Sequence, residues 1–188
     1  MRRYAWLLLL CTCVHTTPIR QEHGPVAHVD IPACNTPKQI VRYSIDPKFT
    51  IAERAKINHA FQVWTEGTNG HAVFLPGNEV YILRTTDSKT IARLTGLLDI
   101  PVPENQRAAG VYTMANIRKE VHIIVDAIAP KYFESVTIHE LGHVLGLSHN
   151  SGKTYMKAAI TDVVPDLLDK PALPKADRDA YFHLRGCQ

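Results

Sequence analysis

The sequence has no hydrophobic run long enough to cross a bilayer and little excess charge of either sign. Its longest apolar run, Tyr4–Val14, falls short of the roughly 18–20 residues that a membrane helix needs, so no transmembrane span is expected. The 21 Lys and Arg residues against 18 Asp and Glu give a net charge of only +3, which does not favour nucleic acid as a partner. The 188 residues, 45% of them hydrophobic, suffice for one folded domain.

A basic start followed by a short apolar run marks the N-terminus. Arg2–Arg3 precede Tyr4–Val14, a pattern typical of a secretory signal peptide, here expected over residues 1–13. The alternative is a buried N-terminal helix, although no amphipathic segment continues the run. A signal peptide predicts a secreted, extracellular protein, with a periplasmic location or a lipid anchor at Cys11 or Cys13 as the alternative.

Cysteine is scarce, with four residues in the chain. Cys34 and Cys187 would remain near the two ends of the mature protein, and in an oxidising compartment the simplest prediction is one disulfide between them. Closing so long a loop would stabilise the fold by roughly 4–5 kcal/mol in the chain-entropy model. The alternative is that Cys34 is a free thiol that caps a metal.

The rest of the chain divides into a leader and a folded domain. Residues 14–37 are rich in Pro, His and Thr and are expected to form a leader or short pro-segment, followed by one domain over residues 38–188. Thr50 and Glu53 form a capping box at the start of an amphipathic helix. A surface excursion is expected at 86–108, strands at 40–45, 71–75, 79–84, 110–113 and 121–125, and helices at 51–65, 130–145 and 174–185. This order predicts an α+β fold.

The most informative segment is the eleven-residue stretch His139–His149. His139 and His143 are four residues apart, so on a helix their imidazoles share one face and can bind one metal ion. Glu140 follows the first of them and can reach a metal-bound water. Gly146 permits a sharp left-handed turn that would bring His149 round as a third ligand. Three imidazoles with one open position are typical of a catalytic zinc site.

Chance does not account for this spacing. With 10 His and 10 Gly in the chain, the full pattern is expected by chance roughly 6 times in 100,000. The alternative, ordinary histidines on a core helix, is correspondingly weak. Met156, seven residues after His149, is a candidate for a methionine turn beneath the metal, with a simple core methionine as the alternative.

The pattern H-E-x-x-H-x-x-G-x-x-H resembles that of the metzincin metallopeptidases, and further segments resemble matrixins. These are Ala60–Trp64 in the first helix, Val121–Asp126 before the active-site helix, and Leu173–Asp177 at the start of the last helix. The resemblance implies a metzincin-like zincin fold, with a twisted mixed sheet, a first helix, an active-site helix and a C-terminal helix.

The resemblance also implies a function. A secreted zinc endopeptidase would hold one Zn²⁺ through His139, His143 and His149 and activate its water, with Glu140 as general base. Met156 would support the site by packing. A monomer acting on protein or peptide substrates is expected, with Gly110–Thr113 as the edge against which the substrate lies. The alternative is a catalytically silent, secreted or lipid-anchored zinc-binding module of the same fold.

Several features depart from the matrixin pattern. Asn150 stands where matrixins usually carry serine, and Cys34 does not lie in a cysteine-switch sequence. The segment 85–120 lacks the His/Asp pattern of a second zinc site and the carboxylate clusters of calcium loops. Neither inhibition by a pro-segment thiol nor a calcium requirement is therefore predicted.

Overall fold

A computed structural model of the chain was used to describe the fold. The chain divides into two units, Met1–Asp30 and Ile31–Gln188, and all described residues belong to the second. The expected signal peptide, most of the expected leader and the expected surface excursion lie outside the described residues. The structure describes residues 34–86, 110–115, 118–151, 153–157, 167 and 171–187.

A five-stranded sheet forms one layer of the domain, in the order β2-β1-β3-β5-β4. The first four strands in this order run parallel, while β4 pairs antiparallel with β5, so the sheet is mixed as predicted. The strands are β1 (Gln39–Ile45), β2 (Ala72–Pro76), β3 (Val80–Thr85), β4 (Gly110–Ala115) and β5 (Arg118–Ile124). Because β4 ends the order, its outer edge is not paired by another of the described strands.

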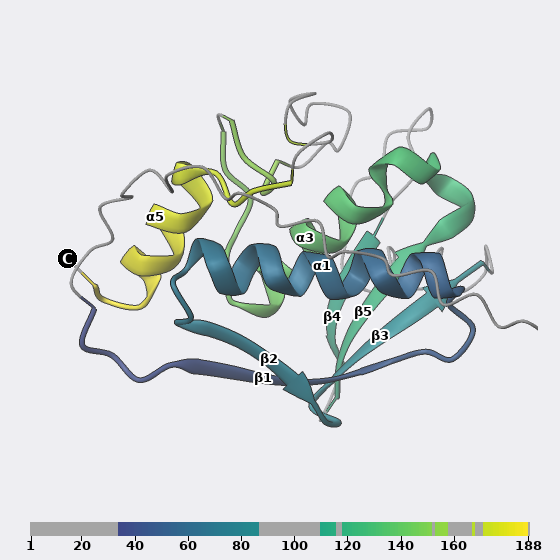
Figure 1. Cartoon of the computed structure of the whole chain (residues 1–188), viewed down its shortest axis with the longest axis horizontal. Coiled ribbons are helices and arrows are strands. Elements are labelled where there is room, and N and C mark those ends of the chain that lie inside the picture. The colour runs from purple at the N-terminus through teal and green to yellow at the C-terminus, as the bar shows by residue number, and fades with distance from the viewer. Residues whose placement is uncertain are drawn as a thin grey trace, which may run out of the picture. The chain divides into compact units, whose positions relative to one another are not determined.

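Helices pack on one face of this sheet. Figure 1 shows α1 (Ile51–Gly67) running above the sheet along β1, with α3 (Phe133–Val144) beside it and α5 (Lys175–Leu184) near the C-terminal end of α1. Short 3-10 turns, η1 (Val125–Ala127) and η2 (Pro130–Tyr132), connect β5 to α3. This arrangement brings α3 against β4 and β5. The α+β fold predicted from the sequence is therefore confirmed.

Local sequence signals explain how α1 is placed. The Thr50 hydroxyl accepts a hydrogen bond from the Glu53 amide at 3.2 Å, and the Glu53 carboxylate accepts one from the Thr50 amide at 2.7 Å, which completes the predicted capping box. Phe61 on the buried face of α1 stacks against Phe74 of β2 with ring centroids 4.9 Å apart. Burial of such rings provides much of the stabilisation between the helix layer and the sheet.

The two ends of the described domain are joined. Cys34 and Cys187 form a disulfide with Cα atoms 4.7 Å apart, the pairing that the sequence predicts. Arg185 at the end of α5 also donates a hydrogen bond to the Pro37 carbonyl at 2.8 Å. Residues 34–37, which the sequence analysis assigned to the leader, are thus attached to the folded domain.

Helix α5 buries a mixed set of side chains. Tyr181 and Phe182 are buried, whereas Leu184 is 53% exposed. The helix buries the polar residues Asp177 and Arg178 instead of a purely apolar stripe. Asp177 is buried because it accepts hydrogen bonds from Thr154 and Tyr155.

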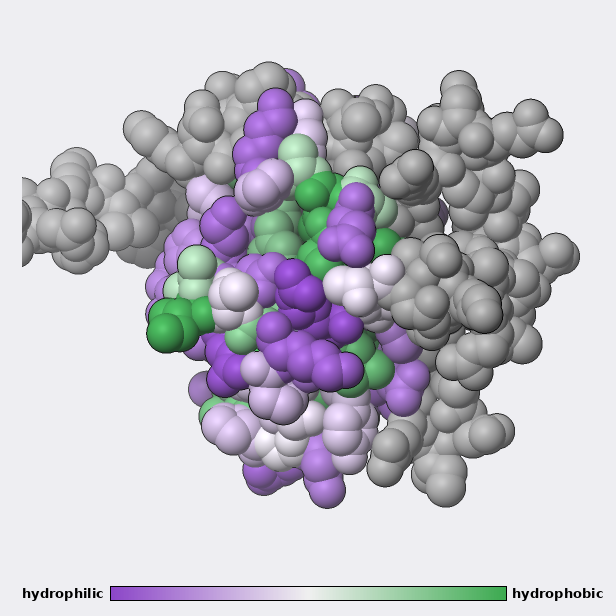
Figure 2. Space-filling model, turned by 90° about the vertical axis from the view of Figure 1, so that its right-hand side faces the viewer, coloured by the Kyte–Doolittle hydropathy of each residue, from purple (hydrophilic) through white to green (hydrophobic). Residues whose placement is uncertain are grey.

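The described part of the face viewed in Figure 2 is largely polar. Figure 2 shows hydrophilic residues at the centre of the viewed face, with hydrophobic residues in smaller groups around them. Among the described residues, the exposed large hydrophobic side chains are Ile40, Ile51, Leu75 and Leu184. None of the helices in the described part of the chain has both the length and the apolar character of a membrane span.

Candidate metal centre

Helix α3 carries His139, Glu140 and His143 and is buried along nearly its whole length. The indole Nε1 of Trp64 in α1 donates a hydrogen bond to the Ile138 carbonyl at 2.9 Å, one residue before the first histidine. This buried contact connects the two helices directly before His139. The position of the first imidazole is therefore set by the helix layer and not by a surface loop.

A glycine turn brings the third histidine back toward the helix. Gly146 has φ of +99°, a conformation that only glycine adopts cheaply. Its amide donates to the His143 carbonyl at 3.0 Å, and the Leu147 amide donates to the Gly142 carbonyl at 2.9 Å. These bonds end α3 as the sequence predicts and direct His149 toward the other two imidazoles.

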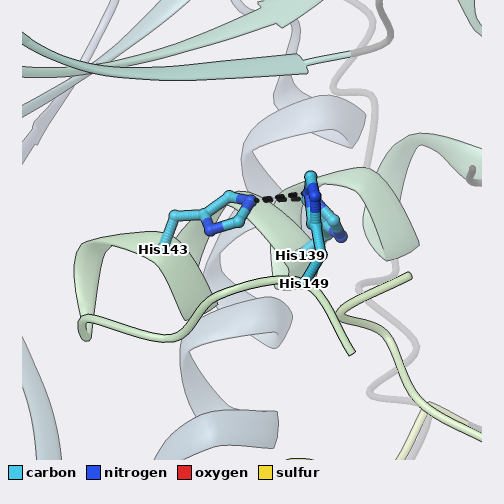
Figure 3. Close-up of side chains that lie close together, drawn as sticks. All are labelled: His139, His143 and His149. Carbon is cyan, nitrogen blue, oxygen red and sulfur yellow. Dashed lines mark hydrogen bonds between the residues drawn. The ribbon is translucent and has the colours of Figure 1, made fainter. Parts of the chain in front are cut away.

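The three imidazoles converge through their Nε2 atoms. The Nε2 atom of His143 lies 3.0 Å from that of His139 and 3.2 Å from that of His149, and the His139–His149 pair is 3.3 Å apart. Figure 3 shows the rings pointing toward one another, two of them from α3 and one from the segment that follows it. Within the described residues, this is the one His/Cys/Asp/Glu group with metal-ligand spacing.

Hydrogen bonds to backbone carbonyls orient two of the rings. His139 Nδ1 donates to the Tyr155 carbonyl at 2.7 Å, and His143 Nδ1 donates to the Leu147 carbonyl at 2.8 Å. A carbonyl only accepts, so each Nδ1 carries the hydrogen and each neutral ring presents a bare lone pair at Nε2. Such lone pairs repel unless a cation lies between them, and metal-bound histidines generally have this outer hydrogen bond.

The spacing suits zinc. A tetrahedral zinc ion with Zn–N distances of about 2.0–2.1 Å requires nitrogen ligands about 3.3–3.4 Å apart. The observed separations of 3.0–3.3 Å are close to this requirement. Neutral imidazoles are ordinary ligands for zinc, and three of them leave a fourth position open.

Burial keeps the first imidazole neutral. The pKa of His139 is lowered from 6.5 to about 4, mainly by burial and also by the neighbouring histidines, against the opposing effect of the Tyr155 carbonyl. Burial also lowers the pKa of His143. Both shifts favour the form of imidazole that can bind a metal.

The lowered pKa of His139 predicts how the metal-free protein responds to acid. Between about pH 6.5 and about pH 4 the unfolded chain binds a proton at this residue and the folded chain does not, so the free energy of unfolding should decrease as the pH falls. The gap corresponds to a loss of roughly 3 kcal/mol. Urea unfolding of chelator-treated protein across this range measures the loss, and His139→Gln should remove most of it. An unchanged slope in that variant would contradict the assignment.

Met156 packs against α3 at Gly142. The side chain is fully buried, and its sulfur occupies the space that a Cβ atom on Gly142 would need. The Met156 carbonyl also accepts a hydrogen bond from the Asn150 amide at 2.8 Å, next to the third histidine. Met156 therefore contacts both the helix and the segment that carries His149.

A buried carboxylate that the sequence did not single out supports the segment that contains Met156. Asp177 of α5 accepts hydrogen bonds from the Thr154 hydroxyl and, at 2.7 Å, from the Tyr155 amide. Burial raises the pKa of Asp177, and these hydrogen bonds oppose the rise. The Tyr155 carbonyl is the acceptor for His139, so Asp177 is connected to the first imidazole through one residue.

The structure describes some of the other residues that the sequence predicts for the site. Glu140 is only 4% exposed, and its side chain lies between its own helix α3 and Gly110 of β4. Lys157, which directly follows Met156, is half-buried. No side chains of residues 111–115 in β4 are described.

Comparisons with known proteins establish the fold. No protein-family profile and no curated protein sequence matches this chain. The structure is similar to that of high choriolytic enzyme 1, a hatching enzyme zinc-protease from Oryzias latipes (medaka fish), with a TM-score of 0.50. The match has 12% sequence identity and covers 79% of this chain and 90% of that one. The metzincin zincin fold predicted from the sequence is thereby confirmed.

Proposed function

We propose that this protein is a secreted, zinc-dependent endopeptidase of the matrixin type. The observation that carries the proposal is the convergence of three Nε2 atoms within 3.3 Å of one another, with a buried glutamate next to the first of these histidines in the chain. Support comes from the fold, which a known zinc-protease shares, and from the matrixin-like segments of the sequence. The disulfide is consistent with an oxidising compartment.

His139, His143 and His149 would hold one zinc ion. Bound zinc with an open position supplies Lewis acidity toward water and toward a peptide carbonyl. The Tyr155 and Leu147 carbonyls keep two of the imidazoles in the tautomer that presents Nε2. Met156 packs against Gly142 of the helix that carries two of these residues, so we expect the ligands to need little rearrangement to bind.

Glu140 would move the proton. Its carboxylate accepts a proton from the attacking water, whose oxygen forms the new bond to the peptide carbon. The same carboxylic acid then donates that proton to the leaving amine as the carbon–nitrogen bond breaks. Hydrolysis therefore adds one water across the peptide bond, and Glu140 returns to its starting state.

The edge strand β4 would align the substrate. Its outer edge is unpaired among the described strands, and it lies against α3, which carries Glu140. An extended peptide can pair with such an edge through backbone hydrogen bonds, which bind a chain with little dependence on its side chains. We place the substrate along Gly110–Thr113.

Digestion of a diverse peptide library tests the proposal. The purified protein should cleave internal peptide bonds, lose this activity in a chelator, and regain it when zinc is added back. Cleavage that persists in metal-free protein would contradict zinc dependence. A zinc-loaded protein that cleaves nothing in the library would favour the silent zinc-binding module instead.

A further inference from the structure

The first residue of the edge strand lies directly against Glu140. If Gly110 carried a Cβ atom, that atom would lie 2.6 Å from Oε1, 2.8 Å from Cγ and 2.9 Å from Cδ of Glu140. These are the three nearest atoms to the added carbon. Side-chain atoms essentially never approach so closely, so even a methyl group here would force the glutamate or the strand to move.

Backbone conformation does not explain the glycine. The described glycines with positive φ are Gly70, Gly146 and Gly186, and Gly110 is not among them. It pairs regularly with Ile123 in the antiparallel β4–β5 ladder. Glycine is a poor strand former, and alanine would fit this backbone at no conformational cost. The space taken by Glu140 is what the position requires.

Glu140 has little freedom to move away. It lies within α3 between buried neighbours, including His139 and Leu141, and is only 4% exposed. A methyl group on residue 110 would therefore displace the carboxylate within the core, because the side chain is too buried to move into solvent. Because proton transfer depends on distance and direction, a shift of about 1 Å can cost about 100-fold in rate.

We infer that Gly110 is a positioning residue for Glu140: its missing side chain leaves the volume in which the general base stands. The expected effect of Gly110 on the rate of peptide cleavage rests on the proposed function. The edge strand then has two tasks, since the same backbone that would pair with the substrate also forms the wall that fixes the carboxylate.

The variant Gly110→Ala tests the inference. We expect kcat to fall about 10- to 100-fold, while zinc content remains that of the wild type and the thermal midpoint falls by a few degrees because of the overpacking. Gly77→Ala is the matched control, because its added Cβ would meet the Arg42 Cβ at the same 2.6 Å, away from Glu140. An unchanged kcat in Gly110→Ala, or an equal loss in Gly77→Ala, would overturn the inference.

A double-mutant cycle shows whether Gly110 acts through Glu140. In the Glu140→Gln background, Gly110→Ala should change the residual kcat less than about twofold, because the base is already absent. A loss as large as in the wild-type background would mean that the glycine acts on something else, such as substrate pairing, and would overturn the inference. If Gly110→Ala alone fails to fold, the double variant Gly110→Ala/Glu140→Ala removes the crowded atoms and should fold; its failure would count against the contact.

A readout without catalysis separates this inference from the proposed function. The ¹³C signal of the Glu140 side-chain carboxyl carbon, identified by its loss in Glu140→Gln, should shift in metal-free Gly110→Ala and remain in place in Gly77→Ala. If the protein cleaves no peptide but this signal shifts, the contact holds and the endopeptidase proposal fails. If cleavage is observed and the signal does not shift, the positioning role is wrong.

Discussion

Replacing Glu140 by glutamine should lower kcat for peptide cleavage by about 100- to 10,000-fold while one zinc ion stays bound. Glutamine has nearly the same shape as glutamate and would fill the same buried space between α3 and β4. It cannot accept a proton from water, however, so the attacking nucleophile is no longer generated at the active site. The measurement is steady-state kinetics on a cleavable peptide together with zinc analysis of the same preparation.

The control for this prediction lies on the same helix. Glu134, in the first turn of α3, forms a side-chain hydrogen bond with His59 and is not part of the converging group. Glu134→Gln should therefore leave kcat within about twofold of the wild type, because glutamine keeps the shape of the side chain and its capacity to hydrogen-bond. If Glu140→Gln kept activity within tenfold of the wild type, another group would have to be the base.

Replacing His143 by alanine should weaken zinc binding by more than about 100-fold, since loss of even an outer hydrogen-bond partner costs a metal site 10- to 100-fold. The Nε2 atom of His143 lies 3.0 and 3.2 Å from the other two, so its removal leaves only two converging nitrogens. Peptide cleavage should be lost together with the metal. Competition with a chromogenic chelator measures the affinity.

The matched substitution is His183→Ala. His183 is exposed on α5 and is not part of the converging group, so both zinc affinity and kcat should remain those of the wild type. The metal-free His143→Ala protein should also unfold close to the wild-type midpoint, since the ring is only half-buried. Retention of tight zinc binding in His143→Ala would mean that the ion lies elsewhere.

The parts of the site that follow local rules were predictable from the sequence. Helical spacing places His139 and His143 on one face, and the conformational freedom of glycine at Gly146 explains the turn toward His149. The capping box at Thr50 likewise depends on residues three positions apart. In each case the interacting groups lie within one or two turns of chain, so spacing alone constrains their geometry.

The contacts that hold the site together were not predictable in this way. Asp177 meets Thr154 and Tyr155 from a helix more than twenty positions along the chain, and its carboxylate in α5 resembles any surface charge in the sequence. Gly110 likewise gives no sign of its closeness to Glu140. Such contacts depend on how elements pack, and a single sequence without its fold does not specify which residues meet.

The order and pairing of the strands could not be predicted from the sequence for the same reason. Alternating apolar residues predicted five strands, and the mixed character of the sheet followed from the metzincin resemblance. The parallel pairing of β2, β1, β3 and β5, with β4 antiparallel at the edge, is a property of the connections between strands. Only this order shows that Gly110 lies on an edge strand packed against α3.

Anomalous diffraction at the zinc absorption edge, from crystals grown with equimolar zinc, tests most directly whether the three imidazoles bind one ion. We predict one strong peak per chain, within about 2.0–2.1 Å of Nε2 of His139, His143 and His149. A map without a peak at this position, or a peak bound by only two of these nitrogens, would contradict the account.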